Sequence, residues 1–516
     1  MLNDVFEYIE GLPVQATSRP IPFIVASAVA VGATIYWRTT PRPKTHFINP
    51  KGTFELTDKN AKDYYAANGK KDVRQWFKEH PDEAVTLNAD FGRITVLPNH
   101  MANEIRNDPR LDFSELTRRM FHANLSGFEA FRAGEHNDAV KSVVMRDLTK
   151  QLSKVTEPLA EEASLAISDL LTESKEYHDI HLKDTILRLI ARISSRVFIG
   201  IELCRNEDWL RITREYTVAS FQAAQELRLY PWIFRPIANM YLPTCRKNRE
   251  LLAEARAIIR PIIQKRAQDK AAAAERGETL KFNDAIEWFE QMHQGMAFDE
   301  AMPQLILSVA AIHTTSDLLS QTITDLALHP EMLEPLREEI ISVLQQDGWA
   351  KTSLYKMKLL DSVIKESQRM KPIAVTSMSR IVKEDMTLSN GLFIGKGNVI
   401  GIDAMEGVWG TQHHTDPEKW DGYRFARMRD DPAKQHRAQL VSTTPEHLAF
   451  GHGEHACPGR FFAANEVKIA LISLLLKYDF KLPEGVTPRV YEYGFSLSSD
   501  PMMKLSVRRR EAEVEI

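Results

Sequence analysis

The ten residues from Phe450 to Gly459 read FGHGEHACPG and form the most informative stretch of the chain. They hold one cysteine, Cys457, and two glycines, Gly453 and Gly459, which let backbone pass close to a flat ligand. The residues from Arg460 onward have a helical pattern, so Cys457 is expected just before a helix N-terminus. That position lowers the pKa of a thiol and favours the thiolate, the form that binds metals. We therefore expect Cys457 to be a metal ligand.

The spacing of this stretch supports a more specific interpretation. The pattern Phe-x-x-Gly-x-x-x-Cys-x-Gly is filled by Phe450, Gly453, Cys457 and Gly459, and it resembles the haem-binding loop of the cytochrome P-450 family. The resemblance implies haem b as the cofactor, with the Cys457 thiolate as the axial iron ligand. It also implies that Phe450, Gly453 and Gly459 belong to the haem-binding site.

Two alternative roles for the cysteine remain open at this point. A lone cysteine is commonly a small buried hydrophobic residue without chemistry. Zinc is a sharper alternative, because four possible ligands fall within eleven residues: His447, His452, His455 and Cys457. A zinc site, however, explains neither Phe450 nor Gly459.

Composition limits the class of protein. The chain has 516 residues, of which 43% are hydrophobic, and a formal net charge of −4. This length permits one large domain or two. The near-neutral charge argues against a nucleic-acid partner. The three cysteines lie far apart and form no disulfide framework, so most of the chain is expected in a reducing compartment.

The N-terminal region has the one membrane signal. Residues 21–37 form an uncharged apolar run of about 17 residues, the short end of a spanning helix. The segment before the run is acidic, which disfavours a cleaved signal peptide, and the basic residues after it favour a cytosolic catalytic portion. We expect residues 1–40 to be a single-pass anchor and residues 41–516 to be the haem-thiolate monooxygenase domain. The resemblance implies the endoplasmic reticulum membrane.

Helical spacing dominates the rest of the chain. We expect helices over residues 137–167, 182–198, 247–268 and 299–328, and short strands over 84–86, 94–97, 386–388 and 503–507. Residues 267–281 are polar and alanine-rich and indicate a surface connection between helices. The fold class is mainly α with a minor β portion, and this distribution is similar to the cytochrome P-450 fold.

Three charged residues form a second constellation. Glu366 and Arg369 share one face of a helix that Pro372 ends, a pair that is most often a solvated surface ion pair. The family has Glu-x-x-Arg ahead of the haem loop and an arginine in the segment between them, a place that Arg424 occupies here. The resemblance implies a buried structural triad of Glu366, Arg369 and Arg424.

A third constellation is the segment 305–317, LILSVAAIHTTSD. Its small residues, Ala310 and Ala311, followed by Thr314 resemble the family's central helix, in which a threonine relays protons to bound oxygen. Threonines that bond their own i−4 carbonyls are the alternative. His313 stands where the family commonly has an acid, so Thr314 and His313 are both candidate catalytic residues.

Haem propionates need cationic partners. The resemblance implies Arg380 and His455 for this role, and it leaves His136, Lys141 and Arg146 as open candidates. Substrate-facing regions are expected, by analogy, at residues 121–131, 221–242, 305–314, 373–378 and 495–497, and their apolar character favours a lipophilic substrate.

These features predict a membrane-bound haem-thiolate monooxygenase that uses O2 and electrons from NADPH through a separate reductase. The expected reductase face carries Lys434, His436, Arg437 and Arg460. The segments AIHTTSD, KESQRM, DGYRF and HACPGRFFAANE are similar to those of fungal secondary-metabolite members such as ent-kaurene oxidase-like enzymes, which implies a terpenoid or polyketide substrate. A haem-thiolate isomerase or dehydratase, which needs no external electrons, remains an alternative.

Overall fold

The computed structural model describes residue 27 and residues 44–55, 57–132, 137–293, 295 and 298–512. Its α-helices are α4 (Lys59–Glu79), α5 (Ala102–Ile105), α6 (Phe113–Met120), α7 (Asn137–Val143), α8 (Thr149–Leu171), α9 (Leu182–Phe198), α10 (Glu207–Leu227), α11 (Arg235–Tyr241), α12 (Pro243–Glu275), α13 (Ala285–His293), α14 (Ala301–Leu328), α15 (Leu333–Asp347), α16 (Lys351–Lys356), α17 (Lys358–Met370), α18 (Met405–Trp409), α19 (Arg424–Asp430), α20 (Gln435–Ala438) and α21 (Arg460–Lys477). The strands are β1 (His46–Phe47), β2 (Val85–Ala89), β3 (Gly92–Leu97), β4 (Leu111–Asp112), β5 (His178–His181), β6 (Thr376–Val382), β7 (Met386–Thr387), β8 (Phe393–Ile394), β9 (Val399–Asp403), β10 (Tyr478–Lys481), β11 (Val490–Tyr493), β12 (Ser496–Ser499) and β13 (Lys504–Arg509).

The chain divides into two compact units. The first comprises residues 1–44 and 382–398, and its described part includes a hairpin of β7 and β8 that turns through Gly391, whose φ is 82°. The second comprises residues 45–381 and 399–516, which include α4–α21 and the other sheets. All candidate site residues that the structure describes belong to the second unit.

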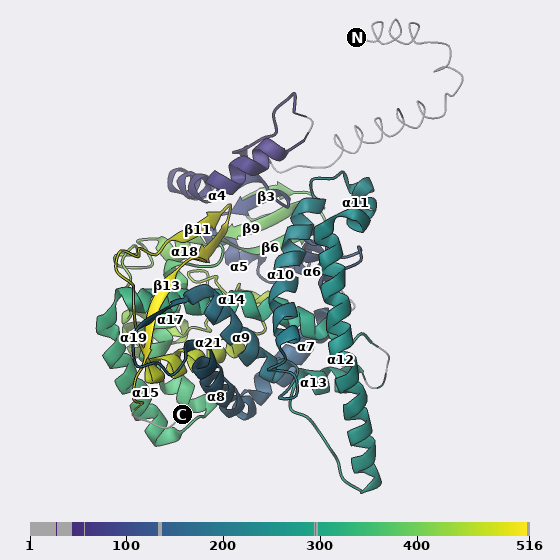
Figure 1. Cartoon of the computed structure of the whole chain (residues 1–516). Helices are drawn as coiled ribbons and strands as arrows, with labels where there is room; N and C mark the ends of the chain where they lie inside the picture. The colour runs from purple at the N-terminus through teal and green to yellow at the C-terminus, as the bar shows by residue number, and fades with distance from the viewer. Residues whose placement is uncertain are drawn as a thin grey trace, which may run out of the picture. The chain divides into compact units, whose positions relative to one another are not determined.

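The largest sheet has the strand order β1-β2-β3-β9-β6-β4. Its strands β3, β9 and β6 lie together in Figure 1, and β2 pairs antiparallel with β3, with Val85 opposite Val96. The pairing of β6 with β9 is irregular between Ser377 and Arg380, and Met378 has a φ of 54°. Such a bulge turns the side chains that follow it, so it sets the direction of Arg380.

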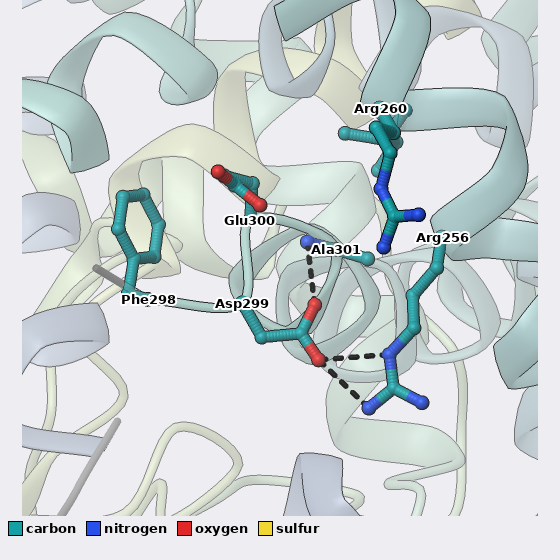
Figure 2. Close-up of a pocket in the computed structure, with 7 residues that line it drawn as sticks. Arg256, Arg260, Phe298, Asp299, Glu300 and Ala301 are labelled. Carbon is teal, nitrogen blue, oxygen red and sulfur yellow. Dashed lines mark hydrogen bonds and ion pairs between the residues drawn. The ribbon is translucent and has the colours of Figure 1, made fainter.

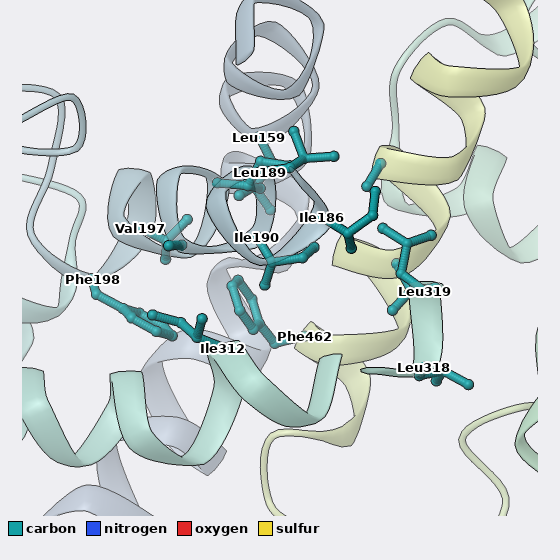
Figure 3. Close-up of a cluster of buried hydrophobic side chains, with 14 of the residues drawn as sticks. Leu159, Ile186, Leu189, Ile190, Val197, Phe198, Ile312, Leu318, Leu319 and Phe462 are labelled. Carbon is teal, nitrogen blue, oxygen red and sulfur yellow. The ribbon is translucent and has the colours of Figure 1, made fainter. Parts of the chain in front are cut away.

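The main core lies where α8, α9, α14 and α21 pack together. Each helix contributes fully buried apolar residues at helical spacing, such as Leu159, Ile190, Leu319 and Phe462 (Figure 3). The rings of Phe198 and Phe462 lie 5.5 Å apart between centroids. Because α21 begins directly after the cysteine loop, this packing holds the end of the loop in place.

The predicted dominance of helix is confirmed. The expected helix over 182–198 coincides with α9, that over 299–328 with α14, and that over 137–167 with α7, a π-helical turn at Val144–Leu148 and α8. The prediction for residues 267–281 is wrong in its first half, because α12 continues to Glu275. Alanine and lysine have high helix propensity, which lets the helix extend into solvent.

The membrane prediction concerns residues that the structure largely leaves undescribed. The expected span, 21–37, and the anchor, 1–40, lie outside the described residues except for residue 27. Among the helices of the described part, none combines the length and apolar character needed to cross a bilayer. The division of the chain into anchor and catalytic domain stays a prediction.

Candidate active site

The cysteine loop is folded by its own backbone. The Cys457 N–H donates to the Phe450 carbonyl (2.8 Å), and a 3₁₀ turn at Gly453–His455 is closed by the Ala456 N–H on the Gly453 carbonyl (3.1 Å). The first residue of α21 is Arg460, so Cys457 precedes the helix as predicted. These bonds fix the direction of the thiol.

The two predicted glycines serve different needs. Gly453 has a φ of 79°, and a Cβ there would lie 2.4 Å from Asn107 Oδ1 and 2.8 Å from Arg106 Cβ. Packing against the segment after α5 therefore requires this glycine, whereas its predicted contact with haem stays a prediction. At Gly459 a Cβ would make only an ordinary contact, with Val144 Cγ1 at 3.9 Å. The predicted contact of Gly459 with haem stays a prediction.

The electrostatics of the Cys457 thiol differ from the expectation. Burial raises its pKa, and the N–H groups of Gly459 and Arg460 together with the Arg460 charge oppose this effect without overcoming it. The helix start alone therefore does not hold a thiolate, and the prediction of a lowered pKa is wrong for the protein's own groups. A bound metal cation would supply the missing stabilisation, since coordination deprotonates a thiol outright.

The central helix α14 has one open face. Most of its residues are buried, including Ile312 and Thr315, yet Ala310 and Thr314, one turn apart, are exposed. The Thr314 hydroxyl donates to the carbonyls of Ala310 (2.9 Å) and Ala311 (3.2 Å). In this state Thr314 therefore makes the i−4 bond of the alternative interpretation. The exposed Ala310 and the Thr314 hydroxyl match the arrangement expected for oxygen binding. The role of Thr314 in moving protons stays a prediction.

His313 lies on a different side of α14. Its Nε2 is 3.0 Å from the carbonyl oxygen of Arg214 on α10, and burial lowers the pKa of the imidazole. The imidazole is therefore neutral near pH 7 and donates to a backbone acceptor. Its predicted part in proton delivery stays a prediction.

The predicted propionate partners come together. Arg380 is 7% exposed, and burial lowers its pKa to about 10. Burial also lowers the pKa of His455, and the charges of Arg380 and Lys141 lower it further, so the imidazole is neutral near pH 7. The carboxylates of Glu454 and Asp112 act on His455 in the opposite direction, so charges of both signs surround this imidazole. By contrast, Arg146 is exposed and pairs with Asp147 at 2.9 Å, and His136 lies outside the described residues.

The predicted structural triad is confirmed. Glu366 and Arg369 are fully buried and form a bidentate pair at 2.8 Å, and Arg424 Nε lies 3.1 Å from both Glu366 oxygens. Arg369 also donates to the carbonyls of Val408 and Pro417, each at 2.7 Å. The network therefore joins α17 to the segment that precedes the cysteine loop.

The zinc alternative is wrong for the described residues. His447 Nε2 lies 2.9 Å from Gln368 Oε1, and His452 contacts the Thr443 carbonyl and Asn103 Oδ1 at 3.1 and 3.0 Å. His455 is exposed. Across the described ranges, no group of three or more His, Cys, Asp or Glu side chains can hold a metal ion.

A separate hollow of about 350 Å³ lies between α12 and the start of α14 (Figure 2). There Arg256 pairs with Asp299 at 2.7 Å, and the Asp299 side chain also accepts from the Ala301 N–H. Ala301 precedes Thr314 by 13 residues of α14, or roughly 20 Å. This hollow is therefore distinct from the candidate active site.

Comparison with known proteins decides the family. The sequence profile described as cytochrome P450 matches residues 70–504. The chain belongs to the cytochrome P450 family. It is 45% identical over 498 residues to cytochrome P450 monooxygenase hepE of Aspergillus oryzae (95% of this chain, 91% of the relative) and 39% identical over 510 residues to monooxygenase adrA of Penicillium rubens (98% and 99%). It is also 47% identical over 439 residues to cytochrome P450 monooxygenase 1 of Gibberella fujikuroi (84% and 100%).

The family membership confirms the mainly helical P450 fold and the predicted likeness to fungal members. This P450 is an oxidoreductase that incorporates oxygen, and the names of its relatives favour monooxygenation over the isomerase or dehydratase alternative. Members of the family use haem with an axial cysteine and receive electrons from NADPH through a reductase.

The residues present fit haem. Cys457 would bind the iron, and the Arg380 guanidinium and the neutral His455 imidazole would donate hydrogen bonds to the haem carboxylates. Haem would supply the activation of oxygen, and the Thr314 hydroxyl on the open face of α14 would be placed to move a proton. The proximity of Phe450 to the cofactor stays a prediction.

Some contacts of the site had no local signal in the sequence. The ring of Phe113 lies 5.3 Å from the Arg380 guanidinium, and Arg106 contacts His452 from 346 residues away in the chain. Lys141, an open candidate from the sequence, acts through its charge on His455. Such long-range contacts depend on the completed fold.

Proposed function

We propose that this P450 is a membrane-bound haem-thiolate monooxygenase that hydroxylates a lipophilic small molecule of fungal secondary metabolism, a terpenoid or polyketide intermediate. It uses O2 and electrons that pass from NADPH through a flavoprotein reductase. The relatives named above are fungal P450 monooxygenases, which supports the broader part of this proposal.

The open face of α14 is the observation that carries the proposal. Ala310 and Thr314 are exposed in the middle of an otherwise buried helix, and Cys457 follows a rigid loop on another segment. Ile373, 41% exposed, belongs to the expected substrate wall, and its neighbour Val375 is fully buried. An apolar wall of this kind suits the oxidation of a hydrocarbon-like substrate.

An exposed apolar surface supports membrane attachment. The connection between α10 and α11 and α11 itself present large apolar side chains with exposed fractions from 38% to 77%: Leu229, Tyr230, Trp232, Ile233, Phe234, Ile237, Met240 and Tyr241. The surfaces of soluble proteins rarely hold so many exposed apolar side chains in one place, and aromatic residues favour the membrane interface. With residues 21–37 as an anchor, this surface would rest on the endoplasmic reticulum membrane from its cytosolic side.

Basic residues near α20 support a reductase partner. Lys434, His436 and Arg437 are exposed, and the ion pairs of Lys434 with Asp431 (3.3 Å) and of Arg437 with Glu446 (3.1 Å) are partly or largely solvated. Exposed pairs contribute little and exchange partners readily. These cations are therefore available to an acidic protein surface.

The test is product analysis. The full chain is expressed with a fungal P450 reductase and supplied with a panel of diterpene and polyketide precursors under isotopically heavy oxygen gas. We expect one precursor to yield a hydroxylated product that carries one heavy oxygen atom and depends on NADPH. A product whose added oxygen comes from water, or that forms without NADPH, would contradict the proposal.

A further inference from the structure

A buried ion cluster lies three residues beyond Thr314 on α14. Asp317 is 6% exposed, and its Oδ1 accepts from the Ser499 N–H and hydroxyl, both at 2.8 Å, and from Lys183 Nζ at 3.1 Å. Its Oδ2 accepts from Lys371 Nζ. One carboxylate of α14 thereby holds α9, the end of α17 and β12.

The segments that Asp317 holds also pair with each other. Lys371 leads directly into residues 373–375, which run beside β12 and the residue before it. The Val375 N–H donates to the Phe495 carbonyl at 2.9 Å, and the Leu497 N–H donates to the Ile373 carbonyl at 3.0 Å. Residues 373–375 and 495–499, the paired segments, are therefore joined by backbone hydrogen bonds, and Asp317 attaches both of them to α14.

The cluster lies at the edge of the open face of α14. Ala310, Thr314 and Asp317 are spaced i, i+4 and i+7, so they follow one stripe of the helix. The first two are exposed and the third is buried, so the open space ends at Asp317. Ile373, one of the paired residues, is 41% exposed. The paired segments are thus attached to α14 one turn beyond Thr314, where the exposed stripe of the helix ends.

The attachment of the paired segments to α14 depends on the negative charge of Asp317. Burial alone would raise the pKa of Asp317, but Lys371, Lys183 and the Ser499 N–H together keep it below its ordinary value, so Asp317 is ionised. Two ammonium groups meet one carboxylate here. Removing the negative charge would leave the buried Lys371 without its ionic partner, which favours local movement.

We propose that Asp317 is a positioning residue that sets the shape of the substrate space by holding the paired segments against α14. The inference rests on the proposed function, in which this space takes a large lipophilic molecule. A ligand too small to reach the paired segments is insensitive to Asp317, whereas a bulky lipophilic ligand depends on it.

Two azoles that both bind haem iron through a ring nitrogen test the inference. Imidazole is small, and clotrimazole is bulky and lipophilic; each is titrated into the full-length holoenzyme while the Soret shift is followed. For Asp317→Asn we expect the Kd of clotrimazole to rise about tenfold, as for the loss of a charge-assisted bond, with the Kd of imidazole unchanged within about twofold. The matched control is Glu162→Gln on α8, which removes a buried carboxylate that also meets two cations, Arg192 and Arg205.

A milder variant covers the case in which Asp317→Asn does not retain haem. Ser499→Ala deletes one donor to Asp317 without unbalancing the charges, and it should raise the clotrimazole Kd alone, by a smaller factor. Equal changes for both azoles, no change for either, or the same selective loss in Glu162→Gln would overturn the inference. Failure of the proposed function is a different result: the wild-type protein would then show no azole-induced Soret shift or no lipophilic product.

Discussion

The substitution Glu366→Gln tests how much the buried triad contributes to the fold. It keeps the shape of the side chain but replaces a carboxylate that accepts from Arg369, from Arg424 and from the Asp421 N–H (3.0 Å). Arg369 has no exposed surface, and the Arg424 side chain is only 10% exposed. Removing one partner of a buried ion network costs about 3–5 kcal/mol. An unfolding entropy of about 2 cal/mol/K per residue then predicts a drop in Tm of about 3–5 °C for a chain of this length.

The assay is thermal unfolding followed by circular dichroism at a fixed scan rate, with haem content measured in parallel. Glu215→Gln is the matched control, because Glu215 also meets two cations, Lys247 at 3.0 Å and Arg211 at 3.4 Å, but is 41% exposed. Surface pairs contribute about 0–1 kcal/mol, so this control should shift Tm by less than about 1 °C. If both variants unfolded at the same temperature, the argument from burial would fail.

Three further predictions concern the thiol, the proton path and a buried lysine. Cys457→Ala should abolish the red-shifted Soret band of the reduced carbon-monoxide complex, whereas Cys204→Ala and Cys245→Ala, at buried thiols, should retain it. Thr314→Ala should keep haem and azole binding but divert NADPH consumption to peroxide or water, lowering product yield by as much as about 10²-fold; unchanged coupling would refute this role. Burial lowers the pKa of Lys365 from 10.5 to about 7. Between pH values of about 7 and 10.5 the unfolded chain therefore binds more protons than the folded one. The unfolding free energy of the wild type minus that of Lys365→Met, measured by urea unfolding, should rise with pH in this range, by at most about 1.4 kcal/mol per pH unit. A difference that does not change with pH would contradict this prediction.

The helical core and the cysteine loop could be predicted because their signals are local. Helical spacing over 182–198 and 299–328 matched α9 and α14, and the loop pattern placed Cys457 directly before α21. The Glu366–Arg369 pair was also local, being three residues apart on one helix. Its burial, however, followed from the resemblance, since the spacing alone is the same for a surface pair.

The parts that could not be predicted depend on where the fold removes water. A helix start lowers the pKa of a thiol, yet burial of Cys457 outweighs that effect, and no spacing in the sequence reports burial. The same holds for His313, whose partner is a backbone carbonyl of α10. The extension of α12 to Glu275 was not predicted, because its polar, exposed residues were interpreted as a connection between helices. Their high helix propensity instead lets the helix continue into solvent.

The end of α17 connects the two buried charge networks. Arg369, in its last turn, donates to the Val408 and Pro417 carbonyls ahead of the cysteine loop, while Lys371, two residues later, bonds Asp317 on α14. Cations at a helix C-terminus are also favoured by the helix dipole. Because both networks are buried, neither can shift without leaving a charge unpaired. This one helix end therefore holds both the segment that precedes the cysteine loop, through Arg369, and α14, through Lys371.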